Sequence, residues 1–156
     1  MATSVRMPPD EAWQVLTAAH TGILTTLRRD GQPIALPVWF VVLDHRVFVS
    51  GPARTKKFSR LRRDPRVSFL VESGRRWSEL RGVHVTGRAQ IVDDPETQAR
   101  VSRALDEKYA GYRTPRAEMP DATRAHYDTV AATIEILVDD RMLTWDNSRL
   151  DLRGSP

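Results

Sequence analysis

Hydrophobic and polar residues alternate along most of this chain, and that alternation predicts a protein built mainly from β-strands. The apolar runs are short, and turns rich in glycine, proline and aspartate, such as Arg29-Asp30-Gly31, separate them. Because such short turns join neighbouring strands, we expect antiparallel pairing. Strands are predicted at residues 23–27, 33–43, 46–50, 67–71, 83–92, 132–138 and 141–145.

Three short helices are expected between these strands. Apolar residues at helical spacing and N-terminal capping signals predict helices over residues 8–19, 56–63 and 95–110. The stretch 111–121 contains two prolines and is predicted to be irregular. Since strands and helices do not alternate regularly, a parallel sheet is disfavoured, and a small antiparallel β-barrel with helical decoration fits best.

The longest predicted strand, residues 33–43, contains a proline at position 37. Proline has no N–H to donate, so a bulge or an unpaired stretch is expected there. The run Pro37-Val38-Trp39-Phe40 has two interpretations. By pattern alone these residues are more often core, but they are also suited to form a flat wall beside a planar ring.

Length and composition favour one domain spanning residues 1–156, with a core over about 10–147 and a polar tail at 148–156. The chain has no cysteine, so disulfides, cysteine-based metal sites and thiol nucleophiles are excluded. No apolar run approaches the roughly 20 residues of a membrane span, and the N-terminus lacks the apolar core of a signal peptide. We therefore expect a cytoplasmic protein with no membrane partner.

One cluster of residues indicates a binding site for phosphate. A strand ends near Ser50-Gly51, a loop follows, and a helix begins at Thr55 with Arg54, Lys56 and Lys57 around its start. The first turn of a helix presents free N–H groups and partial positive charge, which favour anions. The alternative is an ordinary solvated basic helix start. The local pattern leaves both open.

Other functions have less support in the sequence. Lysine and arginine number 24 against 20 acidic residues, and the basic run over residues 54–66 has no interleaved aromatic platform, so nucleic-acid binding is not expected. The four histidines are far apart, so no metal site is predicted. No hydrolase motif is present. Trp77 and Trp145 are candidates for ligand or subunit contacts, because tryptophan is enriched at such surfaces.

Taken in order, these features resemble the pyridoxamine 5′-phosphate oxidase-like split-barrel family. The block Leu61-Arg62-Arg63-Asp64-Pro65-Arg66-Val67 is the most specific, and it looks most like the actinobacterial branch that uses flavin or deazaflavin. The resemblance covers about residues 10–150. Its other parts are Thr25–Leu27 with Asp30-Gly31 and Pro33, Pro37–Phe40, Glu79–Ala89 and Leu143–Asp146.

The resemblance implies a six-stranded split barrel that forms a homodimer with a cofactor between the subunits. It implies an oxidoreductase that transfers a hydride between the cofactor ring and a small planar or conjugated substrate. The deazaflavin coenzyme F-420 is the favoured cofactor and FMN is the alternative. A non-catalytic flavin or haem carrier, or a stress-response module, on the same scaffold is the second possibility. The family's C-terminal Arg-x-His motif is absent from residues 148–153, so a true pyridoxine phosphate oxidase is not expected.

The family also implies where the cofactor is held. Pro37, Val38 and Trp39 match the strand that lies along the ring. The segment that matches the phosphate-binding loop contains Ser50, Gly51, Arg54, Thr55, Lys56 and Lys57, of which Lys57 has the most weight. Trp77 matches a segment that approaches the cofactor or the partner. Hydride transfer on the cofactor needs no side chain as acid or base, so no catalytic residue is assigned.

Overall fold

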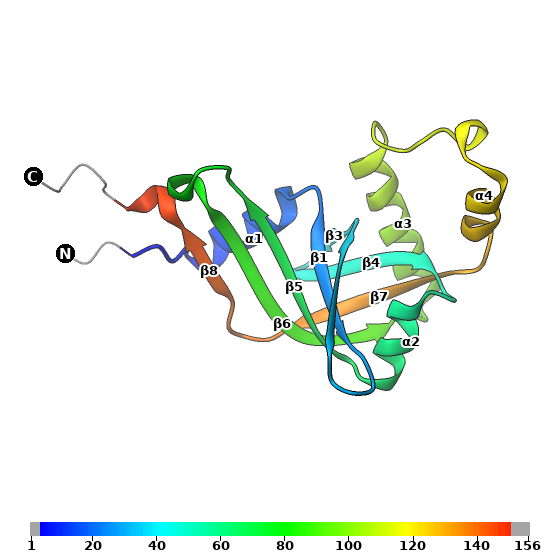
Figure 1. The fold of residues 1–156 in the computed structure, drawn as a ribbon, viewed down its shortest axis with the longest axis horizontal. Coiled ribbons are helices and arrows are strands. Elements are labelled where there is room, and N and C mark those ends of the chain that lie inside the picture. The colour runs from blue at the N-terminus through cyan, green and yellow to red at the C-terminus, as the bar shows by residue number, and fades with distance from the viewer. Residues whose placement is uncertain (1–3, 151–156) are drawn as a thin grey trace, which may run out of the picture.

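The structure is a computed structural model, and it describes residues 4–150 (Figure 1). Within that range the chain forms one curled antiparallel sheet with helices around it, so the predicted class is confirmed. Six residues of the predicted polar tail, 151–156, lie outside the described range. The strands are β1 (Gly22–Leu27), β2 (Pro33–Val38), β3 (Val41–Leu43), β4 (Arg46–Pro52), β5 (Arg66–Ser73), β6 (Arg81–Ile91), β7 (Ala131–Val138) and β8 (Leu143–Asp146).

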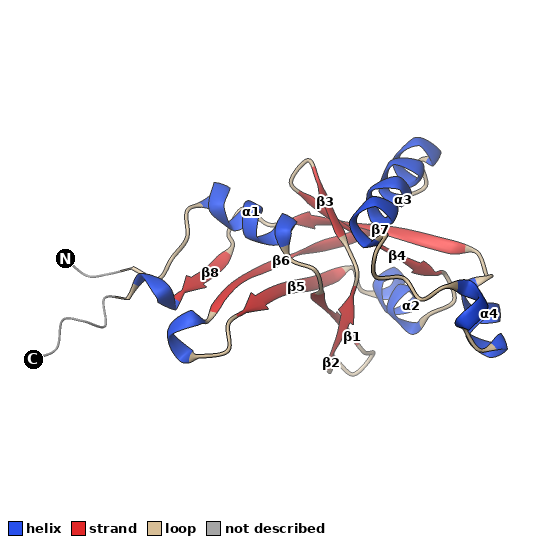
Figure 2. Ribbon diagram, turned by 90° about the horizontal axis from the view of Figure 1, so that it is seen from above, coloured by secondary structure: helices blue, strands red, loops and turns tan. Residues whose placement is uncertain are grey.

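The strands follow the order β2-β1-β5-β6-β7-β4-β3, and β8 pairs with β6. β7 and β8 share one edge of the long strand β6: β7 pairs with its residues 87–91 and β8 with residues 81–84. Figure 2 shows that the end of the sheet carrying β8 extends away from the more closed part. The six strands that the resemblance implies and the seven that the alternation predicts are both fewer than the structure has. The described residues form eight, because residues 33–43 divide into β2 and β3, and the strand predicted at 141–145 is present as β8.

The predicted break in residues 33–43 lies two residues later than expected. Pro37 pairs in register with Ile23, and the chain leaves the sheet only at Trp39 and Phe40. The backbone N–H of Arg28 donates to the Gln32 carbonyl at 2.9 Å, so even-numbered residues of β2 bond to β1. Pro37 therefore directs its backbone to the free edge of β2, where a missing N–H leaves no sheet bond unmade.

Helices α1 (Pro9–Ala18), α2 (Lys56–Arg63) and α3 (Pro95–Tyr109) match the three predicted helices closely. The prediction of an irregular stretch over residues 111–121 missed α4 (Asp121–Tyr127), which begins directly after Pro120. A proline at a helix start is tolerated because its missing N–H would have no intrahelical partner there. Three 3₁₀ turns complete the described elements: η1 (Trp77–Glu79), η2 (Arg116–Glu118) and η3 (Asn147–Arg149).

Two apolar clusters form the core. The larger one lies inside the curl of the sheet, where α1 and α2 add Leu16, Phe58 and Leu61 to the strand residues. The smaller one joins α3 to β3 and β4 through Val101, Leu105 and other buried residues. The helices therefore close the sheet where its strands alone would leave apolar side chains in water.

Four ion-paired side chains join the two ends of the chain to the sheet. Arg81 on β6 lies 2.5 Å from Glu11 on α1 and 3.2 Å from Asp146 on β8. Arg149 in η3 pairs with the same two carboxylates. The first residues of the predicted polar tail are thus held against α1 and β8.

The hydroxyl of Tyr109 holds the break between β2 and β3. Tyr109 is fully buried at the end of α3, and its oxygen accepts the N–H of Phe40 at 3.0 Å. Its single hydrogen has two acceptors within reach, the His20 carbonyl at 2.7 Å and the Phe40 carbonyl at 3.0 Å. Burial raises the pKa of Tyr109, so this hydrogen stays in place at neutral pH.

We predict that Tyr109→Phe lowers the free energy of unfolding by about 1–3 kcal/mol, because it leaves the buried N–H of Phe40 without a partner. Tyr112→Phe is the matched control, since Tyr112 is 64% exposed. Urea unfolding of both variants measures the difference. Equal stability of the two variants would contradict the role assigned to the Tyr109 hydroxyl.

Candidate functional site

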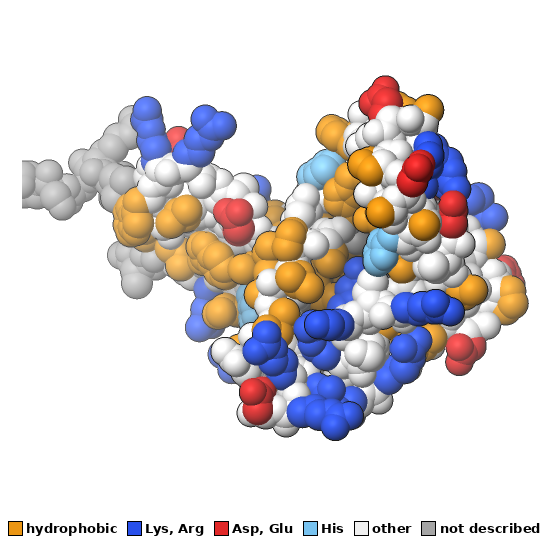
Figure 3. Space-filling model, turned by 45° about the vertical axis from the view of Figure 1, so that its right-hand side comes forward, with side chains coloured by type: hydrophobic (Ala, Val, Ile, Leu, Met, Phe, Trp, Pro, Cys, Tyr) orange, Lys and Arg blue, Asp and Glu red, His pale blue; other side chains and the backbone are white. Residues whose placement is uncertain are grey.

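The predicted phosphate-binding residues lie together where β4 ends and α2 begins. The N–H of Ala53 donates to the Val130 carbonyl, and the N–H of Thr55 donates to the Pro52 carbonyl, at 2.9 and 3.1 Å. These bonds fix the loop that leads into the helix. Figure 3 shows Lys and Arg side chains over the lower part of one face, beside a groove whose other side carries hydrophobic side chains.

Thr55 occupies the N-cap position of α2, as predicted, but its side chain makes no capping hydrogen bond. A capping hydroxyl would accept a hydrogen bond from the N–H of Phe58. This N–H donates instead to the Thr55 carbonyl at 3.2 Å. Within the described residues the Thr55 hydroxyl is buried and has no hydrogen-bond partner. Its capacity to form a hydrogen bond is therefore unused at the start of the helix.

Lys57 is partly buried, and this burial lowers the pKa of its ammonium group. Its Nζ lies so near Gly51 that a Cβ added there would approach it to 3.2 Å. Glycine thus lets the ammonium group approach the β4 backbone closely. Among the described residues no carboxylate forms an ion pair with Lys57, Lys56 or Arg54.

Two further residues of this cluster were missed by the sequence analysis. Arg60 lies one turn after Lys57, and its buried Nη1 has no hydrogen-bond partner among the described residues. Thr133 on β7 shares a 2.6 Å hydrogen bond with the predicted residue Ser50. Because one of these two hydroxyls accepts, its own hydrogen remains free to donate. The i, i+3 spacing from Lys57 was a signal for Arg60, whereas Thr133 depends on sheet pairing.

The predicted ring wall, Pro37, Val38 and Trp39, lies along the free edge of β2. The core interpretation holds for Phe40, which is fully buried, but is wrong for Pro37 and Trp39, which are exposed. Trp39 stacks on Tyr109, with ring centroids 4.3 Å apart and planes 3° from parallel. Its orientation is thus fixed by a buried residue, while 37% of its surface stays open.

Trp77 lies apart from the predicted phosphate-binding residues within the described chain. It begins η1, at the far end of the β5–β6 hairpin, and is 60% exposed. The eight residues of β5 separate that end from α2, a span of roughly 25 Å at about 3.3 Å per residue. Trp145 covers Gly82 on β6 near the same end, where a Cβ would clash with its ring.

The family model described as pyridoxamine 5′-phosphate oxidase matches residues 8–136 of this sequence. The chain belongs to that family. Among curated proteins, none matches the sequence. The predicted resemblance and the split-barrel fold are both confirmed.

Solved structures of similar fold include proteins that are described by different functions. A conserved hypothetical protein from Mycobacterium tuberculosis is 33% identical, with a TM-score of 0.80 over 97% of this chain and 92% of that one. An F-420 reductase is 22% identical, with a TM-score of 0.64 over 87% and 98%. A heme storage protein from Vibrio cholerae is 13% identical, with a TM-score of 0.68 over 88% and 94%. The last two likenesses show the fold alone.

Lys108 on α3 lies against Phe40, the residue that follows the predicted ring wall, although the sequence analysis gave it no role. Its Nζ lies 4.0 Å from the centre of the Phe40 ring and is buried without a hydrogen-bond partner among the described residues. Burial lowers the pKa of Lys108 from 10.5 to about 8. The sequence contains no signal for this position, because the contact depends on how α3 docks against the break after β2.

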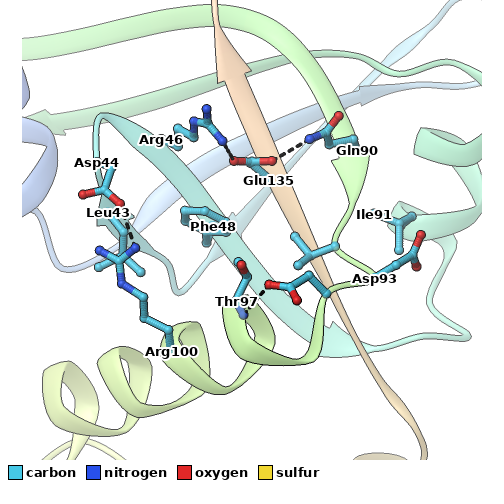
Figure 4. Close-up of a pocket in the computed structure, with 12 residues that line it drawn as sticks. Leu43, Asp44, Arg46, Phe48, Gln90, Ile91, Asp93, Thr97, Arg100 and Glu135 are labelled. Carbon is cyan, nitrogen blue, oxygen red and sulfur yellow. Dashed lines mark hydrogen bonds and ion pairs between the residues drawn. The ribbon is translucent and has the colours of Figure 1, made fainter.

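Two hollows on the described surface contain none of the predicted site residues. One, of about 400 Å³, lies between α3, β4 and β6 (Figure 4). In it the buried Glu135 accepts from Arg46 at 2.5 Å and Gln90 at 2.6 Å, and Arg100 pairs with Asp44 at 2.7 Å. Since these ion pairs join α3 and β7 to the β3–β4 hairpin, we assign this hollow a structural role.

The other hollow is an open depression of about 570 Å³ between α1 and His45. In residues 4–150 no group of three or more potential ligands could hold a metal ion. None of the helices described is long and apolar enough to cross a membrane.

The lowered pKa of Lys108 predicts a pH dependence of stability. Above about pH 8 the folded protein releases this proton, while the unfolded chain keeps it up to about pH 10.5, so rising pH favours folding across that window. Relative to Lys108→Met, wild type should therefore gain stability between pH 7.5 and about pH 10. Urea midpoints of both proteins measure this. Parallel curves would show that burial of the ammonium group has no energetic cost.

Proposed function

We propose that this member of the family is an oxidoreductase that binds a flavin or deazaflavin and transfers a hydride between its ring and a small planar or conjugated substrate. The observation that carries the proposal is the start of α2, where the buried Thr55 hydroxyl and the partly buried Lys57 ammonium group have no partner among the described residues. Arg60, in the last turn of the same helix, adds a buried Nη1 that is also unpaired there. Buried polar groups without partners are rare, and a bound phosphate at the start of the helix would supply the missing partner for Thr55 and Lys57.

The residues present fit a phosphate group. Phosphate accepts hydrogen bonds on several oxygens, and the cluster offers the Thr55 hydroxyl, the Lys57 ammonium group and the first N–H groups of α2. The free hydrogen of the Ser50–Thr133 pair lies on the adjacent strands β4 and β7. Arg54 and Lys56 add positive charge at the exposed side, where they attract the ligand and neutralise its remaining charge.

The wall along β2 fits a planar ring. Its free edge presents the backbone N–H and C=O of Ala35 and the carbonyl of Pro37, which the β1 pairing leaves unused. These groups would pair with polar atoms on the edge of a ring, while Val38 and Trp39 would exclude water from its surroundings. The bound cofactor supplies the hydride chemistry, and the chain binds and orients it.

We favour F-420 as the cofactor because the sequence resembles the deazaflavin-using branch of the family, and one structure of similar fold is an F-420 reductase. FMN is the alternative, since both cofactors carry a ribityl phosphate and place the same demands on Thr55 and Lys57. A cytoplasmic location stays a prediction from the sequence.

We also propose that two copies of the chain complete each site. The β2 wall is open in the single chain, and its apolar residue Leu36 is 42% exposed. Trp77 stands on an exposed hairpin end, separated from α2 of its own chain by the length of β5. A homodimer would place this end of one protomer against the wall of the other and shelter both apolar surfaces.

A haem carrier is the second candidate, and His20 is the observation that favours it. This histidine is exposed, and its ring lies edge-on to Trp39 with centroids 6.1 Å apart. An imidazole beside a flat apolar wall is a suitable axial ligand for haem. Titration with hemin separates the candidates: a carrier binds hemin tightly, loses that binding in His20→Ala, and shows no turnover with flavin or F-420.

We predict that Lys57→Ala weakens binding of F-420 or FMN about tenfold, because it removes one charge-assisted bond to phosphate. Arg62→Ala is the matched control, since it removes an exposed charge from the same helix. Fluorescence titration of the two variants and wild type gives the three dissociation constants. Equal constants for wild type and Lys57→Ala would remove Lys57 from the site.

A further inference from the structure

Four side chains interlock at the break between β2 and β3, and we call them the Lys108 niche. Trp39 and Phe40 form the break, and Lys108 and Tyr109 end the helix packed against it. The Tyr109 ring stacks on Trp39, and its hydroxyl binds the Phe40 backbone. The Lys108 ammonium group lies 4.0 Å from the Phe40 ring centre and 5.5 Å from that of Tyr109.

The ammonium group in this niche has no counter-ion among the described residues. No carboxylate forms an ion pair with it, and its Nζ has no hydrogen-bond acceptor. An unpaired buried charge is costly, and contact with aromatic ring faces offsets only part of that cost. Lys108 stands near the end of α3, where its long side chain could reach water, yet it is folded inwards over Phe40. Such a placement needs a reason beyond packing.

The niche adjoins the proposed ring wall. Trp39 is both the last residue of the wall and a member of the niche, and Phe40 follows it directly in the chain. A ring lying along β2 would therefore sit on the outer side of the same aromatic group that shields Lys108. Because the Phe40 and Tyr109 rings lie against the buried Lys108 Nζ, the effective dielectric constant around it is low and its charge acts over a longer distance than in water.

We propose that Lys108 is an electrostatic positioning residue, whose buried positive charge stabilises negative charge on the cofactor ring held by the β2 wall. The inference rests on the proposed function. Lys108 acts through its field and not by contact, because its Nζ is shielded from the surface. It makes the electron-rich form of the ring bind more tightly than the oxidised form.

The charge balance of the reaction explains why a cation is useful there. A hydride brings two electrons and one proton, so a ring that gains it also gains one negative charge unless a further proton follows. The substrate that gives up the hydride becomes more positive by the same amount and leaves. A fixed positive charge beside the ring therefore favours the reduced cofactor over the oxidised one.

The alternative is that Lys108 has a structural role in packing alone, and the two hypotheses predict different measurements. If Lys108 stabilises the fold, its replacement by an apolar residue destabilises the protein without cofactor and leaves relative affinities unchanged. If Lys108 instead stabilises negative charge on the cofactor ring, Lys108→Met removes a buried charge that has no counter-ion in the cofactor-free protein. The cofactor-free protein should then be at least as stable as wild type, while discrimination between cofactor forms is lost.

The test measures melting temperature without cofactor, and the dissociation constants of the oxidised and reduced forms of F-420 and FMN under anaerobic conditions. It compares wild type with Lys108→Met and Lys108→Arg, the second of which keeps the charge. Arg103→Met is the matched control, because Arg103 is an exposed cation on the same helix.

We expect Lys108→Met to lower the preference for the reduced form about tenfold, which for a two-electron couple shifts the potential by about 30 mV to more negative values. Lys108→Arg and Arg103→Met should stay close to wild type in this ratio. An unchanged ratio in Lys108→Met, or an equal loss in Arg103→Met, overturns the role of Lys108 and leaves the proposed function standing. Failure of wild type to bind any of the four cofactor forms overturns both.

Discussion

The central constraint on this fold is that β2 and β3 follow one another in the chain and yet stand at opposite ends of the sheet order. The sheet must therefore curl until its two ends meet, and only Trp39 and Phe40 connect them. Backbone groups at such a break have no sheet partners, and burying them without hydrogen bonds would be costly. The Tyr109 hydroxyl supplies the missing partner, so the position of α3 and the curl of the sheet depend on each other.

The same constraint explains why the proposed site lies where it does. An unclosed barrel leaves β2 with a free edge and an exposed apolar face. In a single chain such an edge is a liability, because it invites pairing with other molecules. A ligand ring and a second copy of the chain would cover it. The cations at the start of α2 stand at the end of β4, and the partial burial of Lys57 without an acidic partner is costly unless an anion binds there. At the β2 edge and at the start of α2, the same feature therefore lowers the stability of the single chain and favours binding.

Much of the fold could be predicted from the sequence because alternation and capping are local signals. Helix α2 begins and ends at the predicted residues, and the cluster from Ser50 to Lys57 comes together because it is contiguous. The sequence did not show that Pro37 points to a free edge, since edge position depends on distant pairing. It also contains no signal for Thr133 and Lys108, because their positions depend on how β7 pairs with β4 and how α3 packs against Phe40. Trp77 was predicted as a site residue, but within one chain it is separated from the α2 cluster by the length of β5.

In the proposed homodimer, each cofactor site combines the α2 cluster of one protomer with the Trp77 hairpin end of the other. The most direct measurement is cofactor titration of a purified heterodimer made from one Lys57→Ala chain and one Trp77→Ala chain, with each variant homodimer as reference. The account predicts one site of wild-type affinity per heterodimer, because one of its two sites receives an intact Lys57 and an intact Trp77. A heterodimer with no site of wild-type affinity would show that each site lies within a single chain, and would contradict the account.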